Sequence, residues 1–127
     1  MTKKVYLAGG FRSGWQNIVK QNVKNSLFLD PSLHDIKDPT TYTAWDINAV
    51  IECDILFAFM EISNPAGYAM SLEIGYAKAL GKTIIFTEEP LPAPRKRHFD
   101  MVREVCDYNC NTLVEGMDVL QKIVVAS

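Results

Sequence analysis

The sequence predicts an α/β domain with a five-stranded parallel sheet covered by helices on both faces. Short apolar runs typical of buried strands alternate along the chain with segments of helical periodicity. Right-handed connections between successive strands make such a sheet parallel and distribute its helices over both faces. The length of 127 residues suits one domain, so we expect residues 1–127 to fold as a unit.

Five apolar runs bounded by turn residues are predicted as strands. The run at 54–60 (DILFAFM) is almost continuously apolar, which indicates a strand buried on both faces. The first run ends at Gly9-Gly10 and the second at Asp30-Pro31, and both pairs favour tight turns. The predicted strands cover residues 5–8, 26–29, 54–60, 83–86 and 112–114.

Apolar residues at helical spacing lie between these strands. The predicted helices cover residues 15–24, 42–52, 68–80, 98–106 and 117–125. The proline-containing stretches 31–41 and 88–97 are predicted loops, and long loops in small domains are usually functional or mobile. Parallel sheets bind ligands beyond the carboxyl ends of their strands. We therefore expect the site among the turns at 9–10, 30–31 and 64–67 and the loop after 88.

Composition excludes several classes of function. A net charge of −2 is unsuited to a polymeric nucleic acid, which requires a basic surface. No apolar stretch approaches the ~20 residues of a membrane span. Three cysteines without a recognisable leader peptide are typical of a reducing compartment, so we expect a cytoplasmic protein. Cys106 and Cys110 lack further ligands for zinc, and neither a metal nor another cofactor is expected.

Glu73 is the residue that most strongly suggests chemistry. Its neighbours at three and four positions on the predicted helix are apolar apart from one hydroxyl group: Ala69, Met70, Tyr76 and Ala77. A carboxylate on an apolar helix face is costly unless it is paired or used, and carboxyl groups with perturbed pKa values cluster at functional sites. The alternative is a structural carboxylate that binds a neighbouring backbone group.

Asp46 repeats this pattern on the preceding predicted helix, where Ala49 and Val50 are among its neighbours. The alternative is a surface aspartate that stabilises the first helical turn. Taken together, two carboxylates on helices that flank one buried strand suggest a pair. Two carboxyl groups about 5 Å apart serve as nucleophile and acid at the anomeric carbon of a sugar.

The turn at Gly9-Gly10 can present backbone N–H groups to an anion, and Arg12 adds positive charge. An ordinary strand-to-helix turn is the alternative. The sequence contains neither G-x-G-x-x-G nor a P-loop lysine, so dinucleotide and P-loop sites are disfavoured.

Two other groups of basic residues suggest no catalytic pair. His34 and His98 lie in polar surroundings without a predicted partner, so we interpret both as surface residues. The run 95–97 (RKR) is interpreted as a solvated patch, with contact to a phosphate or a neighbouring subunit as the alternative.

Three segments resemble the nucleoside 2-deoxyribosyltransferase family, which also contains the deoxynucleoside 5′-monophosphate N-glycosidases. They are VYLAGGF, WDINAVIECD and GYAMSLEIGYAKALGK, and the resemblance covers most of residues 4–87. It implies a flavodoxin-like fold, in agreement with the predicted sheet. The family nucleophile is the glutamate of an E-x-G-x-A helix. The resemblance therefore implies that Glu73 forms a covalent deoxyribosyl intermediate, which a second nucleobase or water resolves.

The resemblance implies roles for other residues as well. Asp46 contacts the base and supplies or relays the proton that the departing base needs. Tyr6 lies near the nucleophile, and Gly9 belongs to the sugar-binding turn. Arg12 resembles an arginine near the 5′-phosphate, and Asn111 resembles an asparagine that crosses to a neighbouring active site.

One position departs from the family pattern. Six residues before the nucleophile the transferases have aspartate and the monophosphate hydrolases serine, whereas this chain has Gly67. Arg12 favours a nucleotide substrate, and the missing serine disfavours one. The residue that selects the substrate is therefore unassigned.

We expect an enzyme that cleaves or transfers the N-glycosidic bond of a (deoxy)nucleoside through a glycosyl-Glu73 intermediate, with a nucleoside 2-deoxyribosyltransferase as the first choice. A (deoxy)nucleoside 5′-monophosphate N-glycosidase is the alternative, and a non-catalytic nucleotide-binding module is the second alternative. The expected substrate-binding residues are Tyr6, Gly9, Gly10, Arg12, Gly67 and Asn111. The expected partners are a nucleoside or nucleotide, a free nucleobase, and further copies of the chain in a homodimer or larger homo-oligomer.

Overall fold

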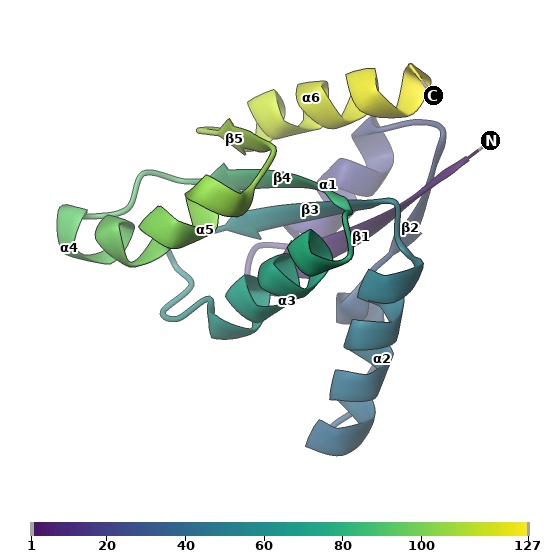
Figure 1. Cartoon of the computed structure of the whole chain (residues 1–127), viewed down its shortest axis with the longest axis horizontal. Helices are drawn as coiled ribbons and strands as arrows, with labels where there is room; N and C mark the ends of the chain where they lie inside the picture. Colours follow the sequence, from purple (N-terminus) through teal and green to yellow (C-terminus); the bar gives the residue numbers. More distant parts are fainter. Residues whose placement is uncertain (1, 127) are drawn as a thin grey trace.

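The computed structural model describes residues 2–126 and contains a five-stranded sheet in the order β2-β1-β3-β4-β5. All four pairs of neighbouring strands are parallel, which confirms the predicted sheet (Figure 1). The strands are β1 (Lys3–Gly9), β2 (Ser26–Leu29), β3 (Ile55–Met60), β4 (Thr83–Glu88) and β5 (Tyr108–Cys110). The order reverses between β1 and β3, and this switch point is where parallel sheets bind ligands.

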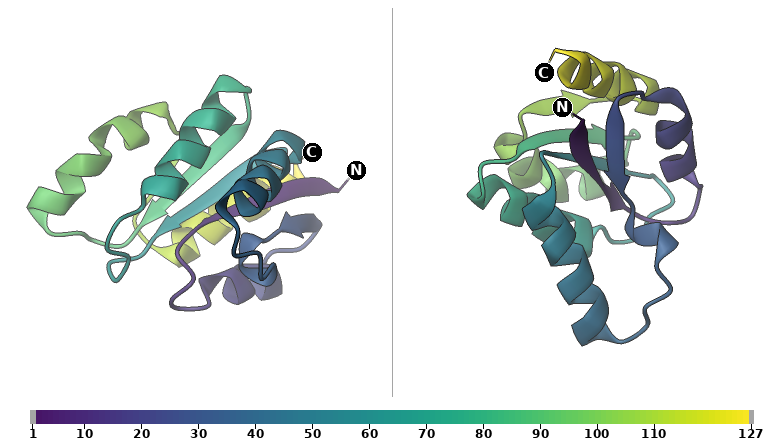
Figure 2. Two further views of the ribbon diagram at one scale, coloured as in Figure 1. Left: turned by 90° about the horizontal axis from the view of Figure 1, so that it is seen from below. Right: turned by 90° about the vertical axis from the view of Figure 1, so that its right-hand side faces the viewer.

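Helices cover both faces of the sheet, as predicted (Figures 1 and 2). The helices are α1 (Trp15–Asn22), α2 (Pro39–Glu52), α3 (Tyr68–Ala79), α4 (Ala93–Lys96), α5 (Asp100–Val105) and α6 (Leu113–Val125). Alternate residues of β1 belong to different cores: Val5 and Leu7 pack with α1 and α6, whereas Tyr6 and Ala8 pack with α2, α3 and α5. Two short 3-10 helices, η1 (Pro31–Leu33) and η2 (Arg97–Phe99), complete the chain. No helix within residues 2–126 is both long and apolar enough to cross a bilayer.

The predicted strand at 112–114 is wrong. β5 lies at Tyr108–Cys110, and Thr112 is instead the N-cap of α6, where its hydroxyl accepts a hydrogen bond from the Glu115 amide at 3.1 Å. Glu115 in turn accepts from the backbone N–H of Asn111 at 3.3 Å. Threonine followed by glutamate three residues later is the sequence pattern of a capping box, so the helix starts at Leu113 rather than at 117.

The predicted loops are also partly helical. α2 begins at Pro39, inside the predicted loop 31–41, because Asp38 caps it by accepting from the Thr41 amide at 3.0 Å. The loop 88–97 contains α4, and the predicted helix 98–106 divides into η2 and α5. The first half of α2 projects past the sheet (Figures 1 and 2).

Candidate active site

Glu73 lies on the buried face of α3, together with Met70, Ile74 and Ala77, and is only 7% exposed. Its partner is Tyr6 of β1, whose hydroxyl donates a hydrogen bond to Glu73 Oε2 at 2.5 Å. No Lys, Arg or His among the described residues forms an ion pair with Glu73. The carboxyl group is therefore buried against a neutral phenol rather than against a cation.

Burial governs the protonation of this pair. Loss of hydration raises the pKa of Glu73 to about 7; the hydrogen bond from Tyr6 lowers it, and the charge of Asp46 raises it further. Burial, and secondly the charge of Glu73, raise the pKa of Tyr6 well above its ordinary value, so Tyr6 remains a donor. Near neutral pH, Glu73 can therefore exist with or without its proton, which suits acid–base or nucleophilic chemistry.

Asp46 lies across a cleft from Glu73. The cleft has a volume of about 230 Å³ and is lined by α2 and α3 residues: Tyr42, Thr43, Asp46, Ile47, Ala69, Leu72 and Glu73. The side chain of Asp46 is 22% exposed, so it is partly buried and reaches the cleft. The structure thus places the two carboxyl groups in one cavity.

His34 is the partner of Asp46, and its interpretation as a partnerless surface residue is wrong. His34 Nε2 lies 3.0 Å from Asp46 Oδ1, and the Ile36 amide donates to Nδ1 at 3.4 Å. In a neutral ring this arrangement puts the proton on Nε2, which then donates to Asp46. The ring of Trp45 packs edge-on at 4.7 Å between centroids. His98, in contrast, is exposed as predicted.

A second cleft of about 360 Å³ adjoins the first, because Ala69 lines both. Its walls come from the ends of β1 and β3 and the start of α3: Gly9, Gly10, Asn64, Ala66, Gly67, Tyr68, Ala69 and Met70. Gly9 has a φ of 149°, and a Cβ there would lie 2.4 Å from the Phe59 carbonyl oxygen. Only glycine permits this close approach of β1 to the end of β3.

Gly67 precedes α3 with a φ of 82°, and a Cβ there would lie 3.0 Å from Met60 Sδ. An aspartate or serine at this position would be strained both by the left-handed backbone and by Met60 and Phe99. The local backbone therefore favours glycine over aspartate or serine at this position.

The sequence interpretation missed two polar residues that follow β3. Asn64 Nδ2 and Glu61 Oε2 each lie 3.3 Å from the position that a Cβ would take on Gly10. Glu61 is 2% exposed, and its Oε2 has no hydrogen-bond partner within the described chain. Buried polar atoms without a partner are rare and mark places where a ligand or water is expected. The sequence signal is a carboxylate that directly follows an apolar strand.

Two predicted binding residues lie apart from Glu73. Arg12 is exposed in the turn before α1 and is not among the residues that line either cleft. Asn111 follows β5, which β3 and β4 separate from β1. Their binding roles stay predictions, and that of Asn111 depends on a neighbouring subunit.

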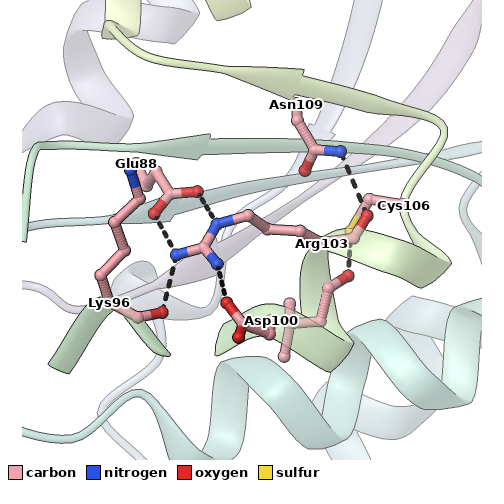
Figure 3. A network of polar contacts seen from close by, with 7 residues as sticks. Glu88, Lys96, Asp100, Arg103, Cys106 and Asn109 are labelled. Carbon is pink, nitrogen blue, oxygen red and sulfur yellow. Dashed lines mark hydrogen bonds and ion pairs between the residues drawn. The ribbon is translucent and has the colours of Figure 1, made fainter. Parts of the chain in front are cut away.

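Another buried carboxylate, Glu88, ends β4 and belongs to a polar network (Figure 3). Arg103 donates to both of its oxygens, at 2.6 and 2.8 Å. Arg103 also donates to Asp100 and to the Lys96 carbonyl, both at 2.8 Å. The network fixes the segment from α4 to α5 against the carboxyl end of the sheet.

No cluster of three His, Cys, Asp or Glu side chains suited to a metal ion occurs in residues 2–126. The side chains gathered around the first cleft are the carboxyl groups of Glu73 and Asp46, the phenol of Tyr6 and the imidazole of His34. Pairs of carboxyl groups are the catalytic groups of most enzymes that act on glycosidic bonds.

No protein-family model and no curated protein sequence matches the chain. Among solved structures, a CMP N-glycosidase from Clostridium botulinum is 22% identical, with a TM-score of 0.66, and the match covers 95% of this chain and 99% of that one. A 2-deoxyribosyltransferase from Leishmania mexicana is 23% identical, with a TM-score of 0.54, over 68% of this chain and 64% of that one. This chain therefore spans less than two thirds of the length of the Leishmania protein. The chain has the flavodoxin-like α/β fold that these two structures share.

Proposed function

We propose that the protein is an enzyme that cleaves or transfers the N-glycosidic bond of a (deoxy)nucleoside or nucleotide, as a member of the nucleoside 2-deoxyribosyltransferase family. The observation that carries this proposal is the hydrogen bond from Tyr6 to the buried Glu73, in a cleft that also contains Asp46. A buried carboxylate without a cationic partner is unfavourable for folding, and its position in a cleft points to a role in chemistry.

In the proposed reaction, Glu73 is the nucleophile. Tyr6 occupies Oε2 and orients the group, so Oε1 is available to attack C1′ of the sugar. The C1′–N bond breaks as the C1′–O bond forms, and the base leaves with the bonding electrons and takes a proton supplied or relayed by Asp46. Water or a second nucleobase then attacks C1′ and gives up a proton to Asp46, as the C1′–O bond to Glu73 breaks and its carboxylate is restored.

The proposed role of His34 is to position Asp46. Its hydrogen bond to Oδ1 holds the Asp46 carboxyl group toward the cleft and leaves Oδ2 free to face the base. Trp45 restrains the imidazole from the side. A group held by such neighbours loses less conformational freedom when the substrate binds.

Transferase and hydrolase differ in whether a nucleobase or water resolves the intermediate. A nucleoside 2-deoxyribosyltransferase is our first candidate. A 5′-monophosphate N-glycosidase is the second, favoured by the likeness to the Clostridium structure over 99% of that chain.

A product assay across deoxynucleosides, ribonucleosides and their 5′-monophosphates, with and without a second free base, tests the proposal. Free sugar without added base identifies a hydrolase, and base exchange identifies a transferase. Glu73→Ala should release no base while remaining folded, and Glu104→Gln, an exposed carboxylate change on α5, is the matched control. Tight nucleotide binding with no base release by the wild type would instead identify a binding module.

We also infer that the chain forms a homo-oligomer. Large exposed apolar side chains recur every four residues along and just beyond α3: Tyr68, Leu72, Tyr76 and Leu80. Such a stripe on a helix surface is typical of an interface between subunits. Light scattering tests the inference: the wild type should be at least dimeric and Tyr76→Glu smaller, whereas a monomeric wild type would refute it.

A further inference from the structure

A third cavity, of about 330 Å³, adjoins the second cleft. It lies between the start of α3 and the segment from α4 to η2, and Ala66 and Tyr68 line both spaces. Its walls are formed by Pro65, Ala66, Tyr68, Ser71, Arg95, His98 and Phe99. Through Ala66, Tyr68 and Ala69, the three spaces form a series that begins at Glu73 and ends at Arg95.

Arg95 is the charged group of this cavity. Its guanidinium donates to the carbonyl oxygens of Ile62, at 2.9 Å, and of Asn64. These two bonds fix the orientation of the group and leave other N–H donors free. No carboxylate among residues 2–126 forms an ion pair with it. A partly buried, oriented and uncompensated guanidinium in a cavity is suited to bind an anion.

The acidic residues nearby in the sequence are engaged elsewhere. Glu88 and Asp100 are both bound by Arg103 (Figure 3). Glu89 accepts a hydrogen bond from the Ile62 amide at 2.8 Å. His98 is exposed at the cavity wall and is the second basic side chain that an anion would meet.

The glycine turn is a poorer place for an anion. The buried Oε2 of Glu61, which has no partner within the described chain, lies beside Gly10. A carboxyl oxygen there accepts hydrogen bonds, so it suits a sugar hydroxyl and disfavours phosphate oxygens. Arg12, which the sequence suggested for the phosphate, does not line this cleft.

We propose that the cavity at Arg95 is a subsite for the phosphate of a nucleotide substrate, with His98 as an auxiliary donor. The base then lies toward Asp46, the sugar between Glu73 and the Gly9-Gly10 turn, and the phosphate at Arg95. The identity of the ligand as a nucleotide rests on the proposed function. The presence of a phosphate site does not rest on the proposed function, so the phosphate subsite and the proposed function can fail separately.

The first test uses inorganic phosphate as the probe. It is titrated at constant ionic strength into ¹⁵N-labelled protein, and amide shifts are followed by NMR. The shifts should centre on residues 66–71 and 95–99. Arg95→Gln should weaken binding about tenfold, the effect of losing a charge-assisted hydrogen bond. Arg97→Gln removes the same charge from an exposed residue outside the cavity and should change binding less than about twofold.

Arg95 also holds the turn at Ile62 and Asn64, so a second variant separates binding from folding. The His98 side chain forms no hydrogen bond or ion pair with other residues in the described part of the chain, and His98→Ala should weaken phosphate binding about threefold. The proposal is overturned if the wild type binds no phosphate or if the amide shifts centre on Gly9 and Gly10. It is also overturned if Arg95→Gln and Arg97→Gln weaken phosphate binding equally, or if His98→Ala binds phosphate as tightly as the wild type does.

The second test identifies the source of the phosphate. CMP and cytidine are titrated calorimetrically into the Glu73→Gln protein, which cannot turn them over. CMP should bind about tenfold more tightly, and Arg95→Gln should abolish that advantage. Equal affinities would refute a nucleotide phosphate. If phosphate binds as expected but the wild type releases no base from any nucleotide, the subsite stands and the proposed function fails.

Discussion

Two glutamates of this protein are equally buried, at 7% exposure, but have opposite surroundings. Glu88 ends β4 and is bound through both oxygens by Arg103 (Figure 3). Glu73 faces a cleft and has a neutral phenol as its partner. The cation stabilises the charge of Glu88 permanently, whereas the charge of Glu73 is left without compensation.

This difference shows why burial alone does not identify a reactive carboxylate. Each oxygen of Glu88 accepts a hydrogen bond from Arg103, whose positive charge lies beside the carboxyl group. Glu73 has a pKa raised to about 7, chiefly by burial, and one oxygen free toward the cleft. The first arrangement stabilises the fold. The second is unfavourable for folding whenever Glu73 is ionised, and the proposed role as a nucleophile would explain why that cost is retained.

The largest effect should come from Glu73→Gln. Glutamine preserves the shape and can still accept the hydrogen bond from Tyr6, but it cannot form the glycosyl intermediate. We expect base release to fall roughly 10³-fold or more while the fold is unchanged, measured by single-turnover assays and circular dichroism. Glu88→Gln should keep most of the activity per folded molecule; if it abolishes turnover as completely as Glu73→Gln, the contrast between the two carboxylates is wrong.

Arg103→Ala should have the second largest effect, on stability. It leaves Glu88 buried without its cation, and breaking a buried pair in this way costs about 3 kcal/mol. Urea unfolding followed by fluorescence measures the change. The Arg103 side chain is only 19% exposed, so solvent screening should not remove the effect. A loss below about 1 kcal/mol would show that the pair behaves like a surface ion pair.

The pH dependence of the stability should report on Glu73. Burial raises the pKa of Glu73 from its ordinary value of 4.5 to about 7, so the folded state binds the proton more tightly than the unfolded chain does. The resulting stabilisation is complete below pH 4.5 and is lost as the pH rises through 7, by up to about 3 kcal/mol. Glu73→Gln should remove this component of the stability profile.

Activity should change in the opposite direction. A nucleophile must be ionised, so kcat/KM should rise with pH and level off above about 7. The protein is then expected to lose stability over the same pH range in which it gains activity. If kcat/KM instead falls above pH 7, Glu73 acts as a general acid and the nucleophilic assignment is wrong.

The sequence predicted the sheet well because its strands are apolar runs with clear turn residues. The apolar run of β3 and the turns at Gly9 and Gly67 are local signals. They correctly predicted the edge of the sheet at which the carboxyl ends of the strands lie. The predicted strand at 112–114 is wrong because the capping pattern of Thr112 and Glu115 prevails over the β propensity of Thr112 and Val114.

The predicted carboxylates meet in one cleft, but their partners were only partly foreseen. The contact between Tyr6 and Glu73 was expected from the resemblance alone. The contact between His34 and Asp46 joins a loop to a helix through tertiary folding, and no periodicity encodes it. The sequence indicates no role for Glu61 and places Arg95 in a solvated patch, because the burial of an irregular segment depends on what packs over it.

The smallest expected effect tests the role of His34, the residue whose position the sequence did not suggest. If it positions Asp46, His34→Ala should lower kcat for base release about tenfold, the equivalent of one hydrogen bond to a charged group. His34→Gln, which retains an N–H donor, should recover most of this loss, and KM should change little in either variant. Equal losses in both variants would indicate that the imidazole itself transfers a proton, and unchanged kcat in His34→Ala would show that Asp46 is held by α2 alone. Asp46 lies midway along α2, whose later residues Ala49 and Val50 pack in the core, so the contact with His34 adds a restraint from the β2–α2 loop to the one that helix packing already gives.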